Sequence, residues 1–229
     1  MMLPRMRNWL LLALVLLTGV AASGRGSVAV DFDALMQKQG LVDVATLDPS
    51  ITVDLKYATT DNFVGKNMYG NLHKAYLHKG TAQSLVKALK QLQAIDPKWG
   101  FVVYDAARPV SVQRIMWNMV KGTKNEKYVA SPYRGGPHNY GVAVDIALTY
   151  NGKPVDMGTP FDNFTTDAHI TNEAGLVKQG RISKEAMKNR QLLRKVLTDN
   201  GFLTYSREWW HFMRYNMQYV RKHIKLLDF

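Results

Sequence analysis

The chain has 229 residues, of which 46% are hydrophobic, a size and composition that favour one compact domain and exclude an intrinsically disordered chain. It contains no cysteine, which excludes disulfides as a source of stability and thiolates as metal ligands or nucleophiles. The formal net charge of +12 attracts anionic polymers, although dispersed lysines and arginines that only keep a surface soluble explain the charge equally well.

The N-terminal residues predict a secretory signal peptide over residues 1–23. Arg5 and Arg7 precede an apolar run at 9–20, and small residues follow at 21–23. The run is short for a bilayer span and no cysteine can carry a lipid, so we expect cleavage and no stable membrane insertion afterwards. A retained N-terminal anchor is the alternative. Cleavage predicts a periplasmic or secreted protein, for which nucleic acid is not an expected partner but weak attraction to anionic cell-wall material is.

The mature chain, residues 24–229, contains no repeat, low-complexity tract or linker, so we expect a single domain. Leucines at helical spacing predict a helix over 81–94, and the apolar run that follows predicts a buried strand over 101–104. Another apolar helical face predicts a helix over 111–121, after the extended pair Arg108-Pro109.

The C-terminal half continues this mixture of elements. Branched aliphatic residues predict a strand over 142–148, and an apolar stripe predicts a helix over 183–200 with Ser183 as its N-cap. Residues 202–205 and 209–213 are predicted as the last strands. Strands and helices without a regular βαβ alternation indicate an α+β fold with a mostly antiparallel central sheet and flanking helices.

Two segments contain the residue types of a catalytic zinc site. His138 and Asp145 lie in one segment, and Glu208 and His211 lie far downstream. Catalytic zinc takes three ligands from His and Asp/Glu and keeps one position for water, while another carboxylate can move the proton of that water. Asp145 lies between two aliphatic residues, where a carboxylate is costly unless it is paired or bound to metal. We therefore expect one zinc ion per chain, held by His138, Asp145 and His211, with Glu208 as the base.

Convergence of these side chains places conditions on the backbone. In a regular strand, residues an odd number of positions apart point to opposite faces of the sheet. We therefore expect His138 on the glycine-rich loop before the strand that carries Asp145. By the same argument, Arg207 and Glu208 must lie on a bend or loop edge if Glu208 and His211 are to face one site.

The arrangement of these residues resembles the zinc D-alanyl-D-alanine dipeptidases, the VanX-type branch of the D-Ala-D-Ala metallopeptidases. Three further stretches agree with this resemblance. Residues 54–63 resemble the N-terminal segment of that family, residues 105–109 its DxxRP turn, and residues 157–162 its MGxxFD loop. Together the matches cover about residues 50–215, nearly the whole mature chain.

Carried over to the matching positions, the resemblance implies a zinc ion in a cleft, held by His138, Asp145 and His211. It also implies that Glu208 is the general base and that Arg108 stabilises the developing oxyanion. These roles agree with general chemistry, because zinc lowers the pKa of bound water to about 7 and a fixed guanidinium is favourable where negative charge develops.

The resemblance further implies substrate binding by Asp162 and Asp105. Asp162 matches a position that meets the free ammonium group of a dipeptide, and a buried carboxylate there would reject substrates with an acylated amine. For Arg108 the structural alternative is an ion pair with Asp105 or with a surface acid. One position departs from the family pattern, because Gly136 stands where serine is common, two residues before the first ligand. One polar contact near the substrate is then lost.

Three hypotheses follow. The first is an exported zinc dipeptidase that hydrolyses the small dipeptide D-Ala-D-Ala to two D-alanines. The second is a peptidoglycan DD-carboxypeptidase or endopeptidase of the same fold, which Asp162 disfavours. The third is a metal-stabilised binding module without turnover, which Glu208 and Arg108 disfavour because a structural metal site needs neither.

Overall fold

The computed structural model describes residues 30–229 of the chain. The predicted signal peptide, residues 1–23, lies outside this part. Within residues 30–229, no helix combines the length and the apolar character that a membrane crossing needs.

A six-stranded sheet forms the centre of the fold. Five strands follow one another across it in this order: β2 (Ile51–Val53), β4 (Trp99–Asp105), β5 (Ala143–Tyr150), β8 (Glu208–Met213) and β7 (Leu203–Tyr205). The sixth, β6 (Lys153–Pro154), pairs with the end of β5. Only β2 and β4 run parallel, and the other pairs within the described sheet are antiparallel. This architecture confirms the predicted α+β class with a mostly antiparallel sheet.

The central strand β5 is buried over all but its last residue. Two long helices, α2 (Lys79–Gln93) and α5 (Lys184–Asp199), pack against each other and against the central strands. Leu85, Leu89 and Leu92 of α2 are fully buried, as their helical spacing predicts. Both helices, and α3 (Val110–Val120), begin and end within two residues of the predicted bounds.

Smaller elements surround this framework. A separate two-stranded sheet pairs β1 (Val42–Asp43) with β3 (Tyr76–Leu77). The short α-helices are α1 (Phe32–Lys38), α4 (Glu173–Lys178) and α6 (Met217–His223). The 3-10 helices are η1 (Val44–Thr46), η2 (Lys56–Ala58), η3 (Glu126–Tyr128), η4 (Pro137–Tyr140) and η5 (Thr166–Ala168).

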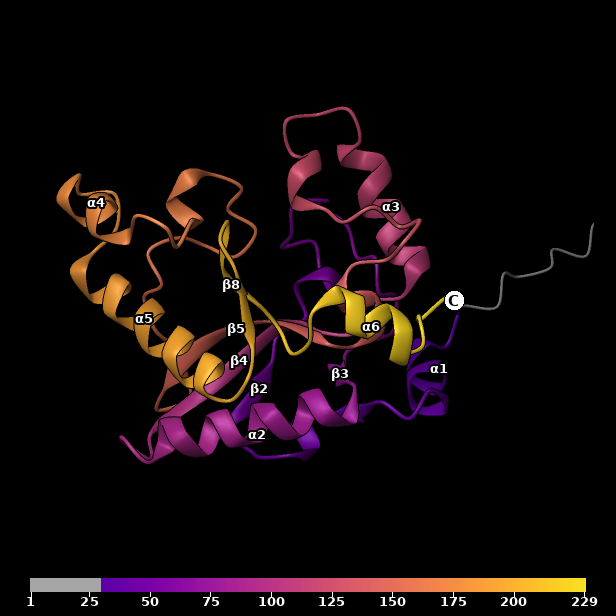
Figure 1. Cartoon of the computed structure of the whole chain (residues 1–229), viewed down its shortest axis with the longest axis horizontal. Helices are drawn as coiled ribbons and strands as arrows, with labels where there is room; N and C mark the ends of the chain where they lie inside the picture. Colours follow the sequence, from indigo (N-terminus) through magenta and orange to yellow (C-terminus); the bar gives the residue numbers. More distant parts are fainter. Residues whose placement is uncertain (1–29) are drawn as a thin grey trace, which may run out of the picture.

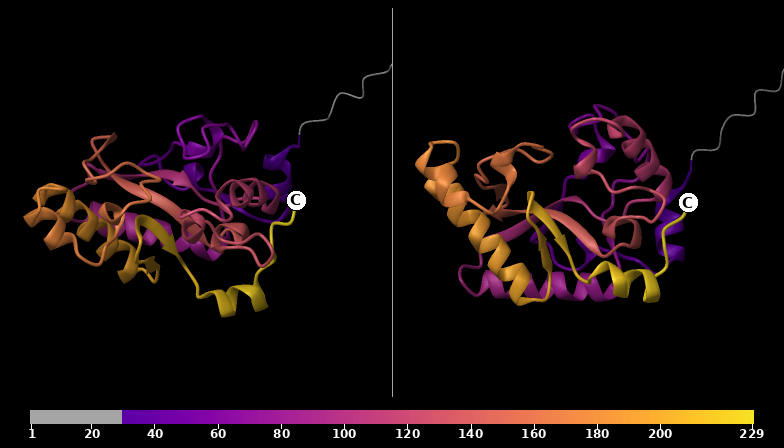
Figure 2. Two further views of the ribbon diagram at one scale, coloured as in Figure 1. Left: turned by 90° about the horizontal axis from the view of Figure 1, so that it is seen from above. Right: turned by 45° about the horizontal axis from the view of Figure 1, so that its top comes forward.

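Figure 1 shows how these elements are arranged around the sheet. Helix α2 runs beneath the strands, and α5 rises from its end. On the other side of the strands, α3 and the segment between β6 and α4 stand apart from each other, as the right-hand view of Figure 2 also shows.

Candidate metal centre and active site

Three acidic and imidazole side chains form a row across the central sheet. The register pairs Asp105 of β4 with Asp145 of β5, and Asp145 with His211 of β8. Residues directly opposite each other on antiparallel strands point to the same face. Residues far apart in the sequence thus meet through the strand register, which includes an irregularity of β4 between Val103 and Asp105.

His138 reaches this row from η4, which precedes β5. Its Nδ1 lies 2.7 Å from the carbonyl oxygen of Ala106 and 3.4 Å from Oδ2 of Asp105. A carbonyl oxygen only accepts hydrogen bonds, so Nδ1 carries the proton and Nε2 presents its lone pair to Asp145 and His211. The predicted loop position of His138 is thus a 3-10 turn, which begins at Pro137 and ends at Gly141 with φ 65°.

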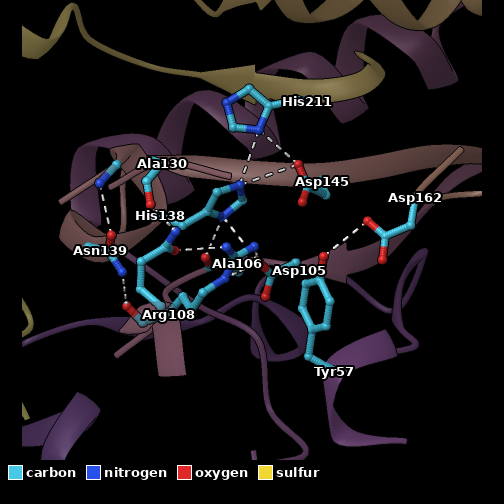
Figure 3. A network of polar contacts seen from close by, with 12 residues as sticks. Tyr57, Asp105, Ala106, Arg108, Ala130, His138, Asn139, Asp145, Asp162 and His211 are labelled. Carbon is cyan, nitrogen blue, oxygen red and sulfur yellow. Dashed lines mark hydrogen bonds and ion pairs between the residues drawn. The ribbon is translucent and has the colours of Figure 1, made fainter. Parts of the chain in front are cut away.

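The donor atoms of the three predicted ligands form a compact triangle, which Figure 3 shows from close by. His211 Nδ1 lies 2.9 Å from Asp145 Oδ1 and 3.1 Å from His138 Nε2, and the third side is 3.3 Å. Ligand atoms around a tetrahedral zinc ion, with bonds of about 2.0–2.1 Å, lie about 3.3 Å apart. The buried cluster could therefore hold a metal ion, and both its donor set and its spacing fit zinc.

The pKa values of His211 and Asp145 are shifted toward the forms that bind metal, whereas the raised pKa of His138 means that a metal ion would displace a proton there. Burial lowers the pKa of His211, whereas at His138 the carboxylates of Asp145 and Asp105 outweigh burial and raise the pKa. Burial would raise the pKa of Asp145, but the two imidazoles outweigh it and lower this pKa. Asp145 is therefore ionised, as a metal ligand must be.

Glu208 lies at the start of β8, next to the turn at Ser206 and Arg207. The pairing of β7 with β8 is irregular here, because neighbouring Thr204 and Tyr205 pair with Phe212 and Glu208. Three residues of β8 therefore bulge between paired positions. This irregularity is the bend that the sequence required, and it lets Glu208 and His211 line the same cavity.

The carboxyl group of Glu208 has an unusual affinity for a proton. Burial raises its pKa well above the ordinary value, and the negative charges of Asp145 and Asp162 raise it further. A carboxyl group in such surroundings can accept a proton and hold it, which is what a general base requires.

Arg108 is fixed by a buried ion pair. Its guanidinium donates to Asp105, with an Nε to Oδ2 distance of 3.1 Å and a shorter contact from Nη2, and Nη1 donates to Gln113 Oε1 at 2.9 Å. The ring centroid of Tyr57 lies 5.0 Å from its Cζ. Burial would lower the pKa of Arg108, but the charge of Asp105 outweighs it and the pKa is raised. Arg108 therefore carries a permanent charge in the cavity wall.

Asp105 does not occupy the substrate-binding position that the sequence predicted. It is fully buried (0% exposed), lies behind Arg108 and His138, and also accepts a short hydrogen bond from the Tyr69 hydroxyl. Among the described residues its polar contacts are with Arg108, His138 and Tyr69, and it is not one of the residues that line the cavity. Its contacts instead fix the orientation of Arg108 and His138, which is the ion-pair alternative.

Asp162 lies at the other side of the cavity in a left-handed conformation, with φ 58°. Tyr57 donates its hydroxyl to Oδ1 at 3.0 Å, and the amide of Phe63 donates to Oδ2 at 3.3 Å. Burial raises the pKa of Asp162 to about 7. Sequence reasoning missed Tyr57, although this residue lies in the stretch 54–63 that carries the family resemblance.

These side chains line one cavity of about 300 Å³, a volume suited to a small ligand. It brings together every predicted site residue except Asp105: Arg108, His138, Asp145, Asp162, Glu208 and His211. Aromatic side chains, among them Phe63, Phe164 and Trp210, form much of the remaining wall. The cavity thus combines a cluster that could hold a metal ion, a buried carboxyl group with a raised pKa, a fixed cation and a second carboxyl group.

The structure also explains Gly136. A Cβ atom added at this position would lie 2.7 Å from the Cβ of Ala130, so the segment that follows η3 packs directly on the glycine backbone. The φ of −90° is open to any residue, so contact with Ala130, and not backbone conformation, favours glycine here.

Comparison with known proteins agrees with this geometry. The family described as D-ala-D-ala dipeptidase matches residues 37–228. A protein named D-alanyl-D-alanine dipeptidase from Escherichia coli (strain K12) is 33% identical over 175 residues, which are 75% of this chain and 83% of that protein. A protein of the same name from Enterococcus faecium is 31% identical over 181 residues, which are 70% of this chain and 84% of that protein.

A third relative with the same name, from Synechocystis, is 28% identical over 182 residues, which are 64% of this chain and 74% of that protein. The family match extends over nearly all described residues and includes every residue that lines the cavity. It confirms the resemblance drawn from the sequence motifs, and it makes the protein an enzyme. The chain therefore belongs to the D-ala-D-ala dipeptidase family of peptidases.

Proposed function

We propose that the protein is an exported zinc dipeptidase that hydrolyses free D-Ala-D-Ala to two D-alanines. The observation that carries this proposal is the position of Asp162, which faces the same cavity as the metal cluster and Glu208. A carboxylate there suits the free ammonium group of a dipeptide whose carbonyl lies at the metal. The names of the relatives support D-Ala-D-Ala as the substrate.

His138, Asp145 and His211 would hold the zinc ion, which when bound supplies a Lewis acid and lowers the pKa of a water molecule to about 7. Glu208 accepts the proton of the attacking water and later delivers it to the amine of the leaving D-alanine. The raised pKa of Glu208 makes its protonated form stable enough for this transfer.

Arg108 and Asp162 position the two charged regions of the reaction. Negative charge develops on the peptide oxygen, and a guanidinium held by Asp105 and Gln113 stabilises it without having to reorganise. Asp162, oriented by Tyr57 and the Phe63 amide, holds the ammonium group. The peptide bond is thereby fixed between two anchors, which lowers the entropic cost of reaching the transition state.

The alternatives make different demands on the same cavity. A DD-carboxypeptidase or endopeptidase must accept an acylated amine, and the buried carboxylate of Asp162 would then lie against a neutral amide without its ionic partner. A binding module has no use for a buried base beside an open metal cluster. Asp162 and Glu208 therefore favour the dipeptidase over both alternatives.

The test is release of alanine by the zinc-loaded protein from four substrates: D-Ala-D-Ala, L-Ala-L-Ala, N-acetyl-D-Ala-D-Ala and a cell-wall pentapeptide. We expect release from free D-Ala-D-Ala and at least a hundredfold lower kcat/KM for the acetylated and pentapeptide substrates. Preferred cleavage of these two would instead identify a DD-carboxypeptidase. No turnover of any substrate by a protein with bound zinc would support the binding module.

Export has a test of its own. We propose that residues 1–23 are removed as a signal peptide, on the basis of their charged, apolar and small-residue segments. N-terminal sequencing of the protein from its native cells should give a start near residue 24. A start at Met1 or Met2 in the mature protein would contradict cleavage.

A further inference from the structure

A buried arginine outside the cavity makes contacts that the proposed reaction does not explain. Arg190, on α5, is only 1% exposed, and burial lowers its pKa to about 10. Arg194, one turn further along, pairs with Glu173 at 2.6 Å, whereas the hydrogen bonds of Arg190 go to neutral oxygens. Burial of a cation without an ionic partner costs free energy, so we expect Arg190 to hold a particular part of the structure in place.

The guanidinium of Arg190 joins the two ends of the segment that carries Asp162. Its Nε donates to the carbonyl oxygen of Met157 at 2.7 Å, and Nη1 donates to the carbonyl oxygen of Asp167 at 2.9 Å. Asp162 lies midway between these residues with φ 58°. A strained backbone of this kind persists only where its surroundings hold it, and Arg190 holds this segment at both ends.

The same guanidinium is linked to the strand that carries Glu208. Its Nη2 lies 3.4 Å from Thr159 Oγ1, which accepts a hydrogen bond from Trp209 Nε1 at 2.8 Å. The Cζ of Arg190 also lies 5.6 Å from the centroid of the Trp209 ring. Trp209 directly follows Glu208 in β8, so a path of direct contacts joins the base to the segment of Asp162.

We propose that Arg190 is a positioning residue that fixes the carboxylate of Asp162 relative to Glu208, and so sets the preference for a free amine. This inference rests on the proposed function of Asp162 as the ammonium anchor. Lysine cannot replace Arg190, because one ammonium group cannot reach three acceptors that a planar guanidinium meets in fixed directions.

The test compares Arg190→Lys with wild type, using D-Ala-D-Ala as substrate and N-acetyl-D-Ala-D-Ala as substrate or competitive inhibitor. We expect KM for D-Ala-D-Ala to rise about tenfold in Arg190→Lys, while kcat falls less than threefold. The KM or inhibition constant of the acetylated compound should be unchanged. Arg194→Met is the matched control, since it removes the Glu173 ion pair from the same helix and should leave this preference intact. Thr159→Ala is a milder second variant, expected to shift the preference about threefold in the same direction.

A double-mutant cycle separates positioning from general support of the fold. In an Asp162→Ala background, Arg190→Lys should cause no further change in KM, because its target is already gone. The proposal would be overturned if Arg190→Lys weakened binding of the free and the acetylated compound equally, or if it still raised KM tenfold in the Asp162→Ala background. It would also be overturned if Arg190→Lys and Thr159→Ala both had the KM values of the wild type. If Asp162→Ala alone kept the preference for the free amine, the proposed function of Asp162 would itself fail.

Discussion

Three carboxyl groups, those of Asp145, Asp162 and Glu208, line one small cavity, and their surroundings give them different proton affinities. Asp145 lies against two imidazoles, which lower its pKa. Within residues 30–229 no such cation contacts Glu208 or Asp162 directly, and burial raises the pKa of both. At the scale of single residues, neighbours thus give the same chemical group different proton affinities, which suit the proposed roles of metal ligand, base and ammonium anchor.

The assignment of Glu208 as base predicts a loss of turnover without loss of metal. Glu208→Gln keeps the shape of the side chain but cannot accept the proton, so we expect kcat to fall by about 10²–10⁴. Zinc content, measured by elemental analysis, should stay at one ion per chain. His211→Gln is the contrasting variant, in which zinc content should also fall. Loss of zinc from Glu208→Gln would show that Glu208 is a ligand and not the base.

Asp162 predicts a narrow pH range for binding of free dipeptides. Because its pKa is raised to about 7, the carboxyl group is neutral below that pH and charged above it, so KM for D-Ala-D-Ala should rise as the pH falls. The α-amino group of the ligand loses its proton above about 8, where KM should rise again.

Steady-state kinetics between pH 5.5 and 9 check this prediction, with KM lowest at about 7–8. Asp162→Asn is the matched control, since an amide of the same shape has no charge to lose, and its KM should be higher and flat below pH 7. A wild-type KM that does not change between pH 6 and 7 would contradict an ammonium anchor at Asp162.

At the scale of elements, the sequence predicted what local patterns determine. Helical spacing of leucines located α2, and the odd separation of Glu208 and His211 correctly required Arg207 and Glu208 to lie at a bend or loop edge. Parallel strand β2 was missed, because three residues with one buried side chain give too short a pattern to recognise.

Contacts between distant segments could not be predicted in this way. The expectation that Asp105 contacts substrate was wrong, because the chain places Tyr69 and Arg108 around it and no local pattern reveals such burial. The Tyr57 hydroxyl meets Asp162 across 105 positions of sequence for the same reason. The residues expected to bind metal could be recognised from their types and spacing in the sequence. The side chains that orient these residues could not, because they are brought into contact only by tertiary packing.

The contact between Gly136 and Ala130 predicts a coupled pair of substitutions. Gly136→Ser would place a Cβ 2.7 Å from the Ala130 Cβ, so η4 and the segment after η3 must move apart. Overpacking of this kind costs about 1–3 kcal/mol in the free energy of unfolding. Denaturant unfolding should show this loss, and Ala130→Gly should restore most of it in the double variant. If the double variant loses as much free energy of unfolding as the two single variants together, the contact with Ala130 is not the reason for glycine at this position.

At the scale of the whole molecule, the metal cluster joins three parts of the fold. His138 belongs to η4, Asp145 to the central strand β5 and His211 to β8. A ligand that binds only the folded state stabilises it by about 4 kcal/mol at a free concentration one thousand times Kd. Metal binding is therefore expected to stabilise the entire domain and not only its active site.

Thermal unfolding with and without a chelator checks this coupling. For a domain of this size, each kcal/mol shifts Tm by about 2–4 °C, so removal of zinc should lower Tm by roughly 10 °C. Asp145→Ala is the control, because it removes a ligand and its Tm should be lower but insensitive to the chelator. A wild-type Tm that a chelator does not change, despite loss of zinc, would show that the cluster does not connect these elements energetically.

The central claim is that turnover of free D-Ala-D-Ala depends on zinc at His138, Asp145 and His211. The most direct measurement is D-alanine release from this dipeptide by one preparation, first as loaded with zinc, then after chelation, and finally after zinc is added back. We predict that the zinc-loaded protein releases D-alanine and that chelation lowers the rate to below about one percent of this value. The rate should recover as the zinc content returns to one ion per chain. Turnover that persists in protein shown to be free of metal would contradict the account.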